Sequence, residues 1–373
     1  MPLDPATRAG AILDIDLSAI VENWQGLAGR VMPAECAAVV KADAYGLGAD
    51  RVAPALAAAG CRTFFVATLD EGIALRAALG PAPEIAVFNG PLPGTAGEFP
   101  AHALTPVLND PGQIERWQIE RWQKLPCPPA AMLQVDTGMA RLGLSPCDFA
   151  ALAGDRPPLG TLRWSALLSH LACADTPDHA LNAAQLARFA ERRRHFPGVR
   201  ASLAASSGIF LGTAYHHDLV RPGAALYGVN PQPGRPNPMR QVVTLKGKII
   251  QVRDVDRGES VGYCAAHVMA GPGRLATVAV GYADGWPRAL SHRGGGVIAG
   301  QRVPLLGRVS MDLATFDVSA VDPILARPGD SIELLGPGYG VDDAARDAGT
   351  IGYEILTSLG RRYHRLYRAA TRG

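Results

Sequence analysis

A lysine, a tyrosine and two glycines stand together directly after a short apolar run. Residues 38–48 read AVVKADAYGLG, so a strand that ends at Lys41 would carry its amine into a site. Gly46 and Gly48 allow positive φ angles and a close approach of the backbone to a ligand, and Tyr45 adds a phenol at the same turn. A desolvated lysine shifts its pKa and is the usual residue that forms a Schiff base. The segment indicates a catalytic or cofactor-bearing Lys41 rather than a solvated lysine after a buried strand.

Other polar residues follow further apolar runs in the first two thirds of the chain. They are Gln134, Asp136, Arg141, Ser169, His170, Ser206, Ser207 and Arg221. Taken singly, each has an ordinary structural explanation, such as a core histidine, a helix cap or a surface cation. Together with the lysine they suit a phosphorylated aldehyde cofactor, because lysine holds the aldehyde while hydroxyl groups and backbone amides hold the phosphate.

Short apolar runs alternate with Ala- and Leu-rich stretches of helical period as far as about residue 228. This alternation predicts an α/β fold, a (β/α)8 TIM barrel over residues 1–238. The predicted strands are 37–40, 63–67, 85–88, 105–108, 131–135, 164–168, 201–204 and 223–227, and the predicted helices include 49–59, 70–79 and 182–196. Thr68 and Glu71 form a capping-box pattern at the start of the second helix. The polar residues gather at the carboxyl ends of the strands, where such a barrel carries its chemistry.

A proline-rich connector at residues 230–238 marks the domain boundary, because its prolines exclude a helix. Beyond it, apolar runs between Gly and Pro turns predict a β-rich C-terminal domain over residues 239–373. The predicted strands there are 242–252, 276–280, 297–303, 313–318 and 331–335.

Composition narrows the class of protein. The chain has 373 residues and a formal net charge of +2, with no long basic run, so we expect a small-molecule substrate and neither nucleic acid nor a membrane as partner. The six cysteines form no Cys-x-x-Cys pair, which predicts no metal site and no disulfide framework. Because no apolar run is long enough to cross a bilayer and the first residues lack a signal pattern, we expect a cytoplasmic enzyme.

Four segments together resemble the alanine racemase family. They are residues 39–48 (VVKADAYGLG), 135–143 (VDTGMARLG), 221–223 (RPG) and 281–285 (GYADG). The resemblance extends over essentially the whole chain. It implies pyridoxal 5′-phosphate bound in the barrel and a homodimer whose active sites combine residues of both subunits.

The resemblance implies that Lys41 holds the cofactor aldehyde and acts as one of two acid/base groups. The other would be Tyr263 of the partner subunit, in the segment SVGYC at residues 260–264. Two groups suit racemisation because the proton must leave one face of the substrate carbon and return on the other. His170 would bridge Tyr263 and Arg221, and Arg221 would face the pyridine nitrogen. Since an arginine stays protonated, it would leave that nitrogen unprotonated.

Further roles follow from the same resemblance. The phosphate group would be held by Tyr45, Ser206 and the backbone at Gly223 and Ala224. Arg141 and the backbone of Met311 would hold the substrate carboxylate. Tyr282 and Asp175 match residues that line the entrance in the family.

Three positions depart from the family pattern. Gln134 stands where many members have a lysine that is often carbamylated, so an amide replaces a negative charge beside Arg141. Ala205 stands where an asparagine usually precedes the phosphate-binding serine. Near the end of the chain, Arg361 or Tyr363 replaces a tyrosine that contacts the phosphate in some members, and an arginine there is able to bind phosphate.

The sequence therefore predicts a racemase that interconverts L- and D-alanine and supplies D-alanine for peptidoglycan. One alternative is a racemase of broader specificity that accepts serine or another small amino acid. A pyridoxal-phosphate-dependent decarboxylase on the same barrel is a second alternative, disfavoured because its glycine-rich and cysteine-containing signatures are absent. A barrel that carries the cofactor without turnover is the third, and a second domain that contains Tyr263 counts against it.

Overall fold

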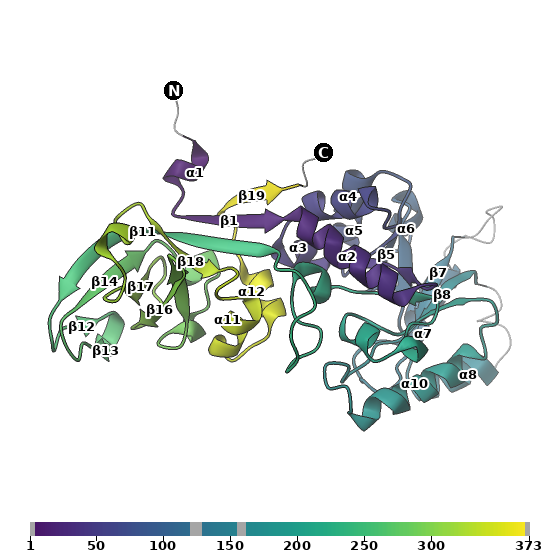
Figure 1. Cartoon of the computed structure of the whole chain (residues 1–373). Helices are drawn as coiled ribbons and strands as arrows, with labels where there is room; N and C mark the ends of the chain where they lie inside the picture. The colour runs from purple at the N-terminus through teal and green to yellow at the C-terminus, as the bar shows by residue number, and fades with distance from the viewer. Residues whose placement is uncertain (1–3, 120–128, 155–161, 370–373) are drawn as a thin grey trace.

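The computed structural model describes residues 4–119, 129–154 and 162–369. Figure 1 shows two parts side by side: parallel strands wrapped by helices, and a part that consists mainly of β-strands. The first strand of the chain runs between them. The predicted combination of a parallel α/β barrel with a mostly β domain is confirmed.

Seven parallel strands form the main sheet of the barrel, in the order of the sequence. They are β3 (Ala38–Val39), β4 (Thr63–Val66), β5 (Glu84–Val87), β6 (Thr105–Leu108), β7 (Ala131–Gln134), β8 (Trp164–Leu168) and β9 (Arg200–Ser202). Helices cover the outer face and side chains fill the inner one, so both faces are buried. Strands of this kind read as continuous apolar runs, as the fully buried TFFV of β4 illustrates.

A short strand pair closes the barrel. Strand β10 (Leu219–Val220) pairs in parallel with β2 (Glu35–Cys36), which directly precedes β3. On its other side the same segment meets β9, because the Asp218 and Arg221 N–H groups donate to the carbonyl groups of Ala201 and Ala204.

The predicted eighth strand at 223–227 is wrong. The strand lies immediately before Pro222, and residues Ala224–Tyr227 form the 3-10 helix η4. The Leu226 N–H donates to Gly223 O, and the Tyr227 hydroxyl donates to Val39 O, so this segment turns across the end of the barrel instead of extending it.

Helices cover the outside of the barrel. They are α2 (Leu17–Val31), α4 (Ala49–Ala58), α5 (Leu69–Leu79), α6 (Glu98–Ala101), α7 (Pro111–Ile119), α8 (Pro146–Gly154) and α10 (Ala180–Arg193), with η2 (Ser207–Phe210) and η3 (Thr213–Tyr215) in later loops. The capping box predicted at α5 is present in both directions, between Thr68 and Glu71. The predicted helix at 182–196 spans 180–193.

The second sheet is built around the long strand β11 (Val243–Val255). Its first half pairs with β18 (Ser331–Leu335) and with the N-terminal strand β1 (Ala11–Asp16), and its second half pairs with β14 (Gly273–Val278). Because β11 joins both ends of one set of strands, it closes them into a small barrel. The set comprises β14 (Gly273–Val278), β15 (Gly295–Ile298), β16 (Gln301–Leu306), β17 (Ala314–Asp317) and β18 (Ser331–Leu335).

The predicted strand at 297–303 is a hairpin. Ala299 and Gly300 both have positive φ, at 49° and 79°, and connect β15 to β16 as a two-residue turn. Such a turn matches the twist of antiparallel strands, and the glycine in it indicates that the predicted strand is divided at this point.

Both ends of the chain join the β domain. Strand β1 (Ala11–Asp16) lies between β11 and β19 (His364–Arg368), antiparallel to the first and parallel to the second. The sequence pattern did not predict β1. Short elements complete this part: α1 (Pro5–Arg8), β12 (Ser260–Val261), η5 (Tyr263–Ala265), β13 (His267–Val268), η6 (Tyr282–Asp284), η7 (Arg288–Leu290), η8 (Pro323–Leu325), α11 (Val341–Ala348) and α12 (Gly352–Ser358).

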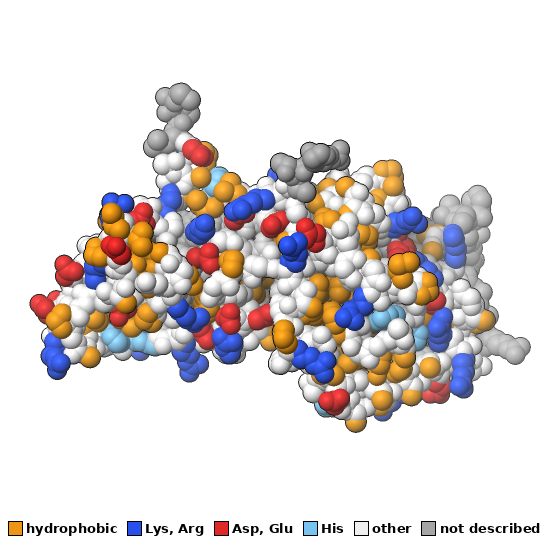
Figure 2. All heavy atoms as spheres, in the orientation of Figure 1, with side chains coloured by type: hydrophobic (Ala, Val, Ile, Leu, Met, Phe, Trp, Pro, Cys, Tyr) orange, Lys and Arg blue, Asp and Glu red, His pale blue; other side chains and the backbone are white. Residues whose placement is uncertain are grey.

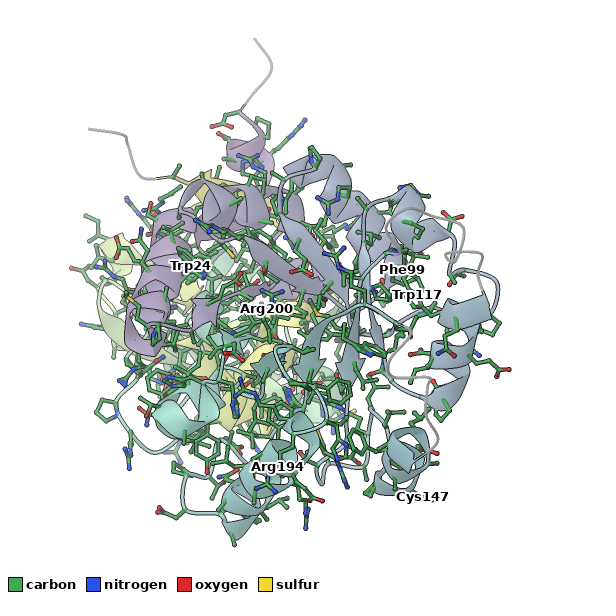
Figure 3. All side chains as sticks on the ribbon, turned by 90° about the vertical axis from the view of Figure 1, so that its right-hand side faces the viewer. Trp24, Phe99, Trp117, Cys147, Arg194 and Arg200 are labelled. Atoms are coloured by element: carbon green, nitrogen blue, oxygen red, sulfur yellow. The ribbon has the colours of Figure 1, made fainter. Side chains whose placement is uncertain are left out.

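Arg200 connects the amino ends of several barrel strands through ion pairs. Its guanidinium donates to Glu35 on β2 and to Glu84 on β5, at 2.9 Å in each case. Thr63 Oγ1 donates to the other oxygen of Glu35 at 2.6 Å. Figure 3 looks along the barrel with Arg200 inside the ring of strands. This ion network lies at the end opposite to the loops that follow the strands, so it stabilises the barrel and leaves the other end for chemistry.

Positive and negative side chains are mixed over the surface that Figure 2 shows, in keeping with the small net charge. Among the described residues, no helix has the length and apolar character needed to cross a membrane. The described cysteines are free thiols; Cys127 lies outside the described residues.

Candidate functional site

Lys41 stands at the carboxyl end of β3, as the first residue of the turn α3 (Lys41–Gly46). Residues 42–45 all adopt the left-handed conformation, with φ between 51° and 55°. For residues other than glycine this conformation costs roughly 1–2 kcal/mol each, so a run of them persists only where the surroundings hold it. Strained backbone of this kind is concentrated at functional sites.

The β domain packs directly on this turn. Arg365 of β19 donates to Gly46 O at 2.6 Å and, through its other nitrogen, to Leu359 O at 3.1 Å. A Cβ at Gly46 would lie 2.5 Å from Leu356 O, so α12 leaves no space for a side chain there. The C-terminal end of the chain thus fixes the turn that begins at Lys41.

Tyr45 forms one wall beside the turn. Its ring lies 4.7 Å from that of Tyr227 and 6.1 Å from that of Tyr353. Burial raises the pKa of Tyr45, so its hydroxyl keeps its proton and serves as a hydrogen-bond donor. The hydroxyl lies against Gly223, where any Cβ would collide with it.

Ser206 organises the segment that follows β10. Its buried Oγ accepts hydrogen bonds from the N–H groups of Gly223 (3.0 Å) and Ala225 (3.2 Å). Because Oγ is the acceptor in both, the hydroxyl hydrogen is left to donate to a ligand. Tyr45, Ser206 and Gly223 therefore meet at one point, as the sequence predicts.

Arg221 is buried at the end of β10. Its guanidinium donates to Ser202 Oγ and to Ser169 O, the latter at 2.6 Å. Burial lowers its pKa to about 10, which leaves it a cation at neutral pH. These bonds hold the guanidinium in one orientation across the carboxyl ends of β8, β9 and β10.

His170 follows β8 and lies among cations. Its pKa falls to about 3, chiefly because of burial and then because of Arg221, Arg141 and Lys41. The imidazole is therefore neutral at physiological pH. Gln185 accepts the Ala172 N–H and donates to His170 O at 2.9 Å, which fixes the backbone at this histidine.

The loop after β7 carries Arg141. Both Asp136 oxygens serve the loop, accepting backbone N–H bonds of 2.8–2.9 Å from Gly138, Met139 and Ala140. Gln134 donates to Leu142 O at 3.1 Å. Arg141 is exposed at the rim, and its charge acts on both Lys41 and His170, so the structure brings it into the predicted cluster.

Tyr263 and Met311 do not join this cluster within one chain. They lie on the β domain. Tyr263 is in η5, which connects β12 to β13, and these two strands lie at the end of the molecule far from the barrel (Figure 1). Tyr263, Met311 and Tyr282 are 71%, 54% and 44% exposed. The Met311 turn contacts the Tyr282 turn, because the Ala283 N–H donates to Met311 O at 2.9 Å. Both predicted residues are thus exposed on the β domain.

No pattern in the sequence predicts that Tyr353 lies beside Tyr45. This residue, in the first turn of α12, lies next to Tyr45, and burial and the neighbouring Asp175 and Asp342 raise its pKa. Arg361, by contrast, is exposed, and Tyr363 is buried in the β domain. A tyrosine in a short helix carries no signal of its own; only the packing of α12 against α3 reveals its place.

The residues at the carboxyl end of the barrel fit pyridoxal 5′-phosphate. Lys41, Arg141 and Arg221 concentrate positive charge that calls for an anionic ligand, and the fixed pair of Ser206 and Gly223 supplies donors beside the Tyr45 hydroxyl. The lowered pKa of Lys41 suits an amine that reacts with an aldehyde. Fold and site together define a pyridoxal-phosphate-dependent barrel enzyme with an appended β domain.

Comparison with known proteins gives the family. Residues 15–231 match the alanine racemase N-terminal domain, and residues 242–367 match the alanine racemase C-terminal domain. The chain belongs to the alanine racemase family. It is 54% identical over 370 residues to an alanine racemase of Rhodospirillum rubrum, covering 98% of each chain. It is 51% identical to a catabolic alanine racemase of Mesorhizobium japonicum, with 96% of this chain and 93% of the relative covered.

Solved structures agree with this assignment. The alanine racemase of Bartonella henselae, described with covalently bound pyridoxal phosphate, superimposes with a TM-score of 0.92 at 42% identity and covers 96% of this chain and 100% of its own. The biosynthetic alanine racemase of Pseudomonas aeruginosa gives a TM-score of 0.88 at 34% identity, with 97% and 100% covered. The chain is accordingly an isomerase that uses pyridoxal 5′-phosphate.

Proposed function

We propose that the protein interconverts L- and D-alanine in active sites that two copies of the chain share. Lys41 acts on one face of the substrate carbon, and Tyr263 of the second copy acts on the other. The observation that carries this proposal is the separation within one chain: a charged cluster around Lys41 in the barrel, and an exposed Tyr263 on the distant β domain.

Lys41 is suited to take and return a proton at the substrate carbon. Burial lowers its pKa, and the positive charge of Arg141 lowers it further. A lowered pKa increases the fraction of neutral amine at physiological pH, and a neutral amine is the form that acts as a base. When bound, the cofactor holds the substrate amino group covalently and draws electrons from the bond between Cα and hydrogen.

Arg221 and His170 set the charge of the site. Arg221 would lie beside the pyridine nitrogen of the cofactor and, because it keeps its own protons at neutral pH, would leave that nitrogen unprotonated. A pyridine ring without that proton would withdraw electrons from the substrate Cα less strongly. This would favour return of the proton to Cα over its transfer to another atom. The neutral His170 links Arg221 to Tyr263 without adding a charge.

Hydroxyl groups and backbone amides hold the phosphate, and a cation holds the substrate carboxylate. Tyr45 and Ser206 supply the hydroxyl groups beside Gly223 and Ala224. Arg141 binds the carboxylate together with the backbone of Met311 of the second copy. Gln134 keeps the loop of Arg141 in place through Leu142 O, in the position of the lysine that many members have.

The direct test follows the optical activity of L-alanine by circular dichroism. Loss of the signal without release of carbon dioxide or pyruvate supports racemisation. Carbon dioxide would identify a decarboxylase, and an unchanged signal would leave a cofactor carrier. Parallel assays with L-serine decide between an alanine-specific and a broader racemase. We further propose that the D-alanine serves peptidoglycan synthesis in the cytoplasm, which a D-alanine requirement of a deletion strain would test.

Shared sites have a sharper test in mixed dimers. We expect Lys41→Ala and Tyr263→Phe each to lower racemisation by orders of magnitude, as for loss of a positioned acid/base group. Unfolding and refolding the two variants together would create mixed dimers in which one site has both native residues. Random pairing restores about a quarter of the native sites, because half of the dimers are mixed and each holds one intact site. No recovery would contradict sites shared between copies.

A further inference from the structure

Glu71 makes contacts beyond the helix cap that its sequence pattern predicts. In the capping box, its N–H donates to Thr68 Oγ1 at 3.3 Å, and its Oε2 accepts the N–H groups of Thr68 (3.2 Å) and Ala67 (2.8 Å). The second carboxylate oxygen, Oε1, accepts the N–H of Ala42 at 2.7 Å. That bond crosses from α5 to the turn that begins at Lys41, and it is the shortest of the four.

Ala42 is the point at which the backbone enters the left-handed conformation. It directly follows Lys41, and its φ is 51°. A backbone N–H bound to a carboxylate is a charge-assisted hydrogen bond, stronger than one between neutral groups. Glu71 thus holds the strained turn beside the lysine, while Arg365 holds its far end at Gly46.

The negative charge of Glu71 also acts on the amine of Lys41. Arg141 lowers the pKa of Lys41 and Glu71 raises it, while His170 nearby is neutral. Asp43, on the turn itself, has one carboxylate oxygen engaged with the Ala49 N–H at 2.8 Å. Glu71 is therefore the negative group that offsets the cations around the amine.

We propose that Glu71 is a positioning residue for Lys41. Its carboxylate fixes the first residue of the left-handed turn and balances the positive charge around the amine. The inference rests on the proposed role of Lys41. It assigns to a capping-box glutamate a task in cofactor attachment that helix capping alone does not include.

Two substitutions at position 71 separate these effects, and a third provides the control. Glu71→Gln keeps an oxygen that accepts the Ala42 N–H but removes the charge. Glu71→Ala removes both. Thr68→Ala weakens the same helix cap from the other side by removing the oxygen that accepts the Glu71 N–H, and it leaves the bond between Glu71 and Ala42 in place, so it reports a merely structural loss.

Three measurements on the full chain form the test. The first is borohydride reduction of the holoenzyme followed by mass spectrometry of the labelled lysine. The second is the dissociation constant of pyridoxal 5′-phosphate, measured by absorbance on chain freed of cofactor. The third is the pH dependence of acetic anhydride labelling at Lys41 in that cofactor-free chain.

We expect Glu71→Ala to weaken cofactor binding about tenfold or more, as for loss of a hydrogen bond to a charged group. Glu71→Gln should retain affinity within a few-fold but move half-maximal labelling of Lys41 to lower pH, by roughly half a unit or more. Thr68→Ala should lower the melting temperature and leave both readouts unchanged.

If both Glu71 variants match Thr68→Ala in affinity and pH dependence while the cofactor is attached to Lys41, the inference is overturned and the proposed function stands. If the label resides on another lysine, both are overturned. Should Glu71→Ala fail to fold, the pH dependence of Glu71→Gln decides alone: a shift supports the inference, and an unshifted profile rejects it.

Discussion

Replacing Gly223 by alanine would place a methyl group in the proposed cofactor site. A Cβ built at Gly223 points at the Tyr45 hydroxyl and lies 3.0 Å from Cζ and 3.3 Å from Cε2 of that ring. Gly223 also donates its N–H to Ser206 Oγ, so a backbone shift there would disturb the serine as well. One methyl group thus tests the contact between two parts of the proposed phosphate site.

Tyr45 has little freedom to move away. Its ring packs against Tyr227 at 4.7 Å, and its backbone belongs to the left-handed turn with φ at 55°. Adding a methyl group to a well-packed position costs about 1–3 kcal/mol. If the strain falls on the conformation that binds the cofactor, the dissociation constant of pyridoxal 5′-phosphate rises by roughly 5- to 150-fold.

The assay is an absorbance titration of the cofactor-free variant with pyridoxal 5′-phosphate, alongside urea unfolding. Gly26→Ala is the matched control, because no atom lies within 4 Å of its added Cβ and it sits within helix α2. We expect the control to bind as the native chain does. Native affinity in Gly223→Ala would refute the contact between Tyr45 and Gly223 as a determinant of cofactor binding.

Two further predictions concern stability. Arg200→Met should leave Glu35 and Glu84 without their cation and lower the free energy of unfolding in urea by about 1–3 kcal/mol, with cofactor affinity unchanged; an equal loss of affinity would contradict the separation of the two barrel ends. The pKa of His170 in the folded chain is about 3, below its ordinary value of 6.5. Above pH 6.5 the residue is neutral in both the folded and the unfolded chain, so it does not lower the free energy of unfolding. As pH falls from 6.5 towards 3, the unfolded chain gains a proton that the native chain does not, and stability declines by up to about 1.4 kcal/mol per pH unit. His170→Asn should reduce this decline in stability, as measured by urea unfolding at several pH values. NMR should show that the imidazole of His170 does not titrate between pH 5 and 8. A titration midpoint near 6.5 for His170 would contradict the burial argument.

Much of the barrel could be predicted from the sequence, because the strands of a buried parallel sheet consist of continuous apolar runs. Residues 105–108 and 164–168 match their predicted strands completely. The eighth strand was not predicted correctly because the segment that closes the barrel is short. Leu219 and Val220 pair with β2, Arg221 adds one bridge to Ala205, and so few residues have no recognisable period. The apolar residues that drew the prediction, Ala224–Tyr227, are buried by a 3-10 turn instead.

The candidate site was predicted unevenly for a similar reason. Residues with distinctive chemistry, such as Lys41 and Arg221, stand out at strand ends. The left-handed turn of residues 42–45 has no signature, because three of its four residues are Ala or Tyr, which do not favour that conformation, and tertiary contacts impose it. Tyr353 reaches Tyr45 through contacts between distant parts of the chain, which no local pattern records.

Strand β1 lies between β11 and β19, so the β domain contains both the first and the last strand of the described residues. Arg365, which holds Gly46, is separated from it by 319 positions. At synthesis rates of about 5–20 residues per second, roughly 15–60 s pass between the synthesis of Gly46 and that of Arg365. The barrel strands are complete well before that, but the turn at Lys41 gains this support only after Arg365 has been synthesised. A chain truncated before β19 is therefore expected to have a barrel in which the turn at Lys41 is not firmly held.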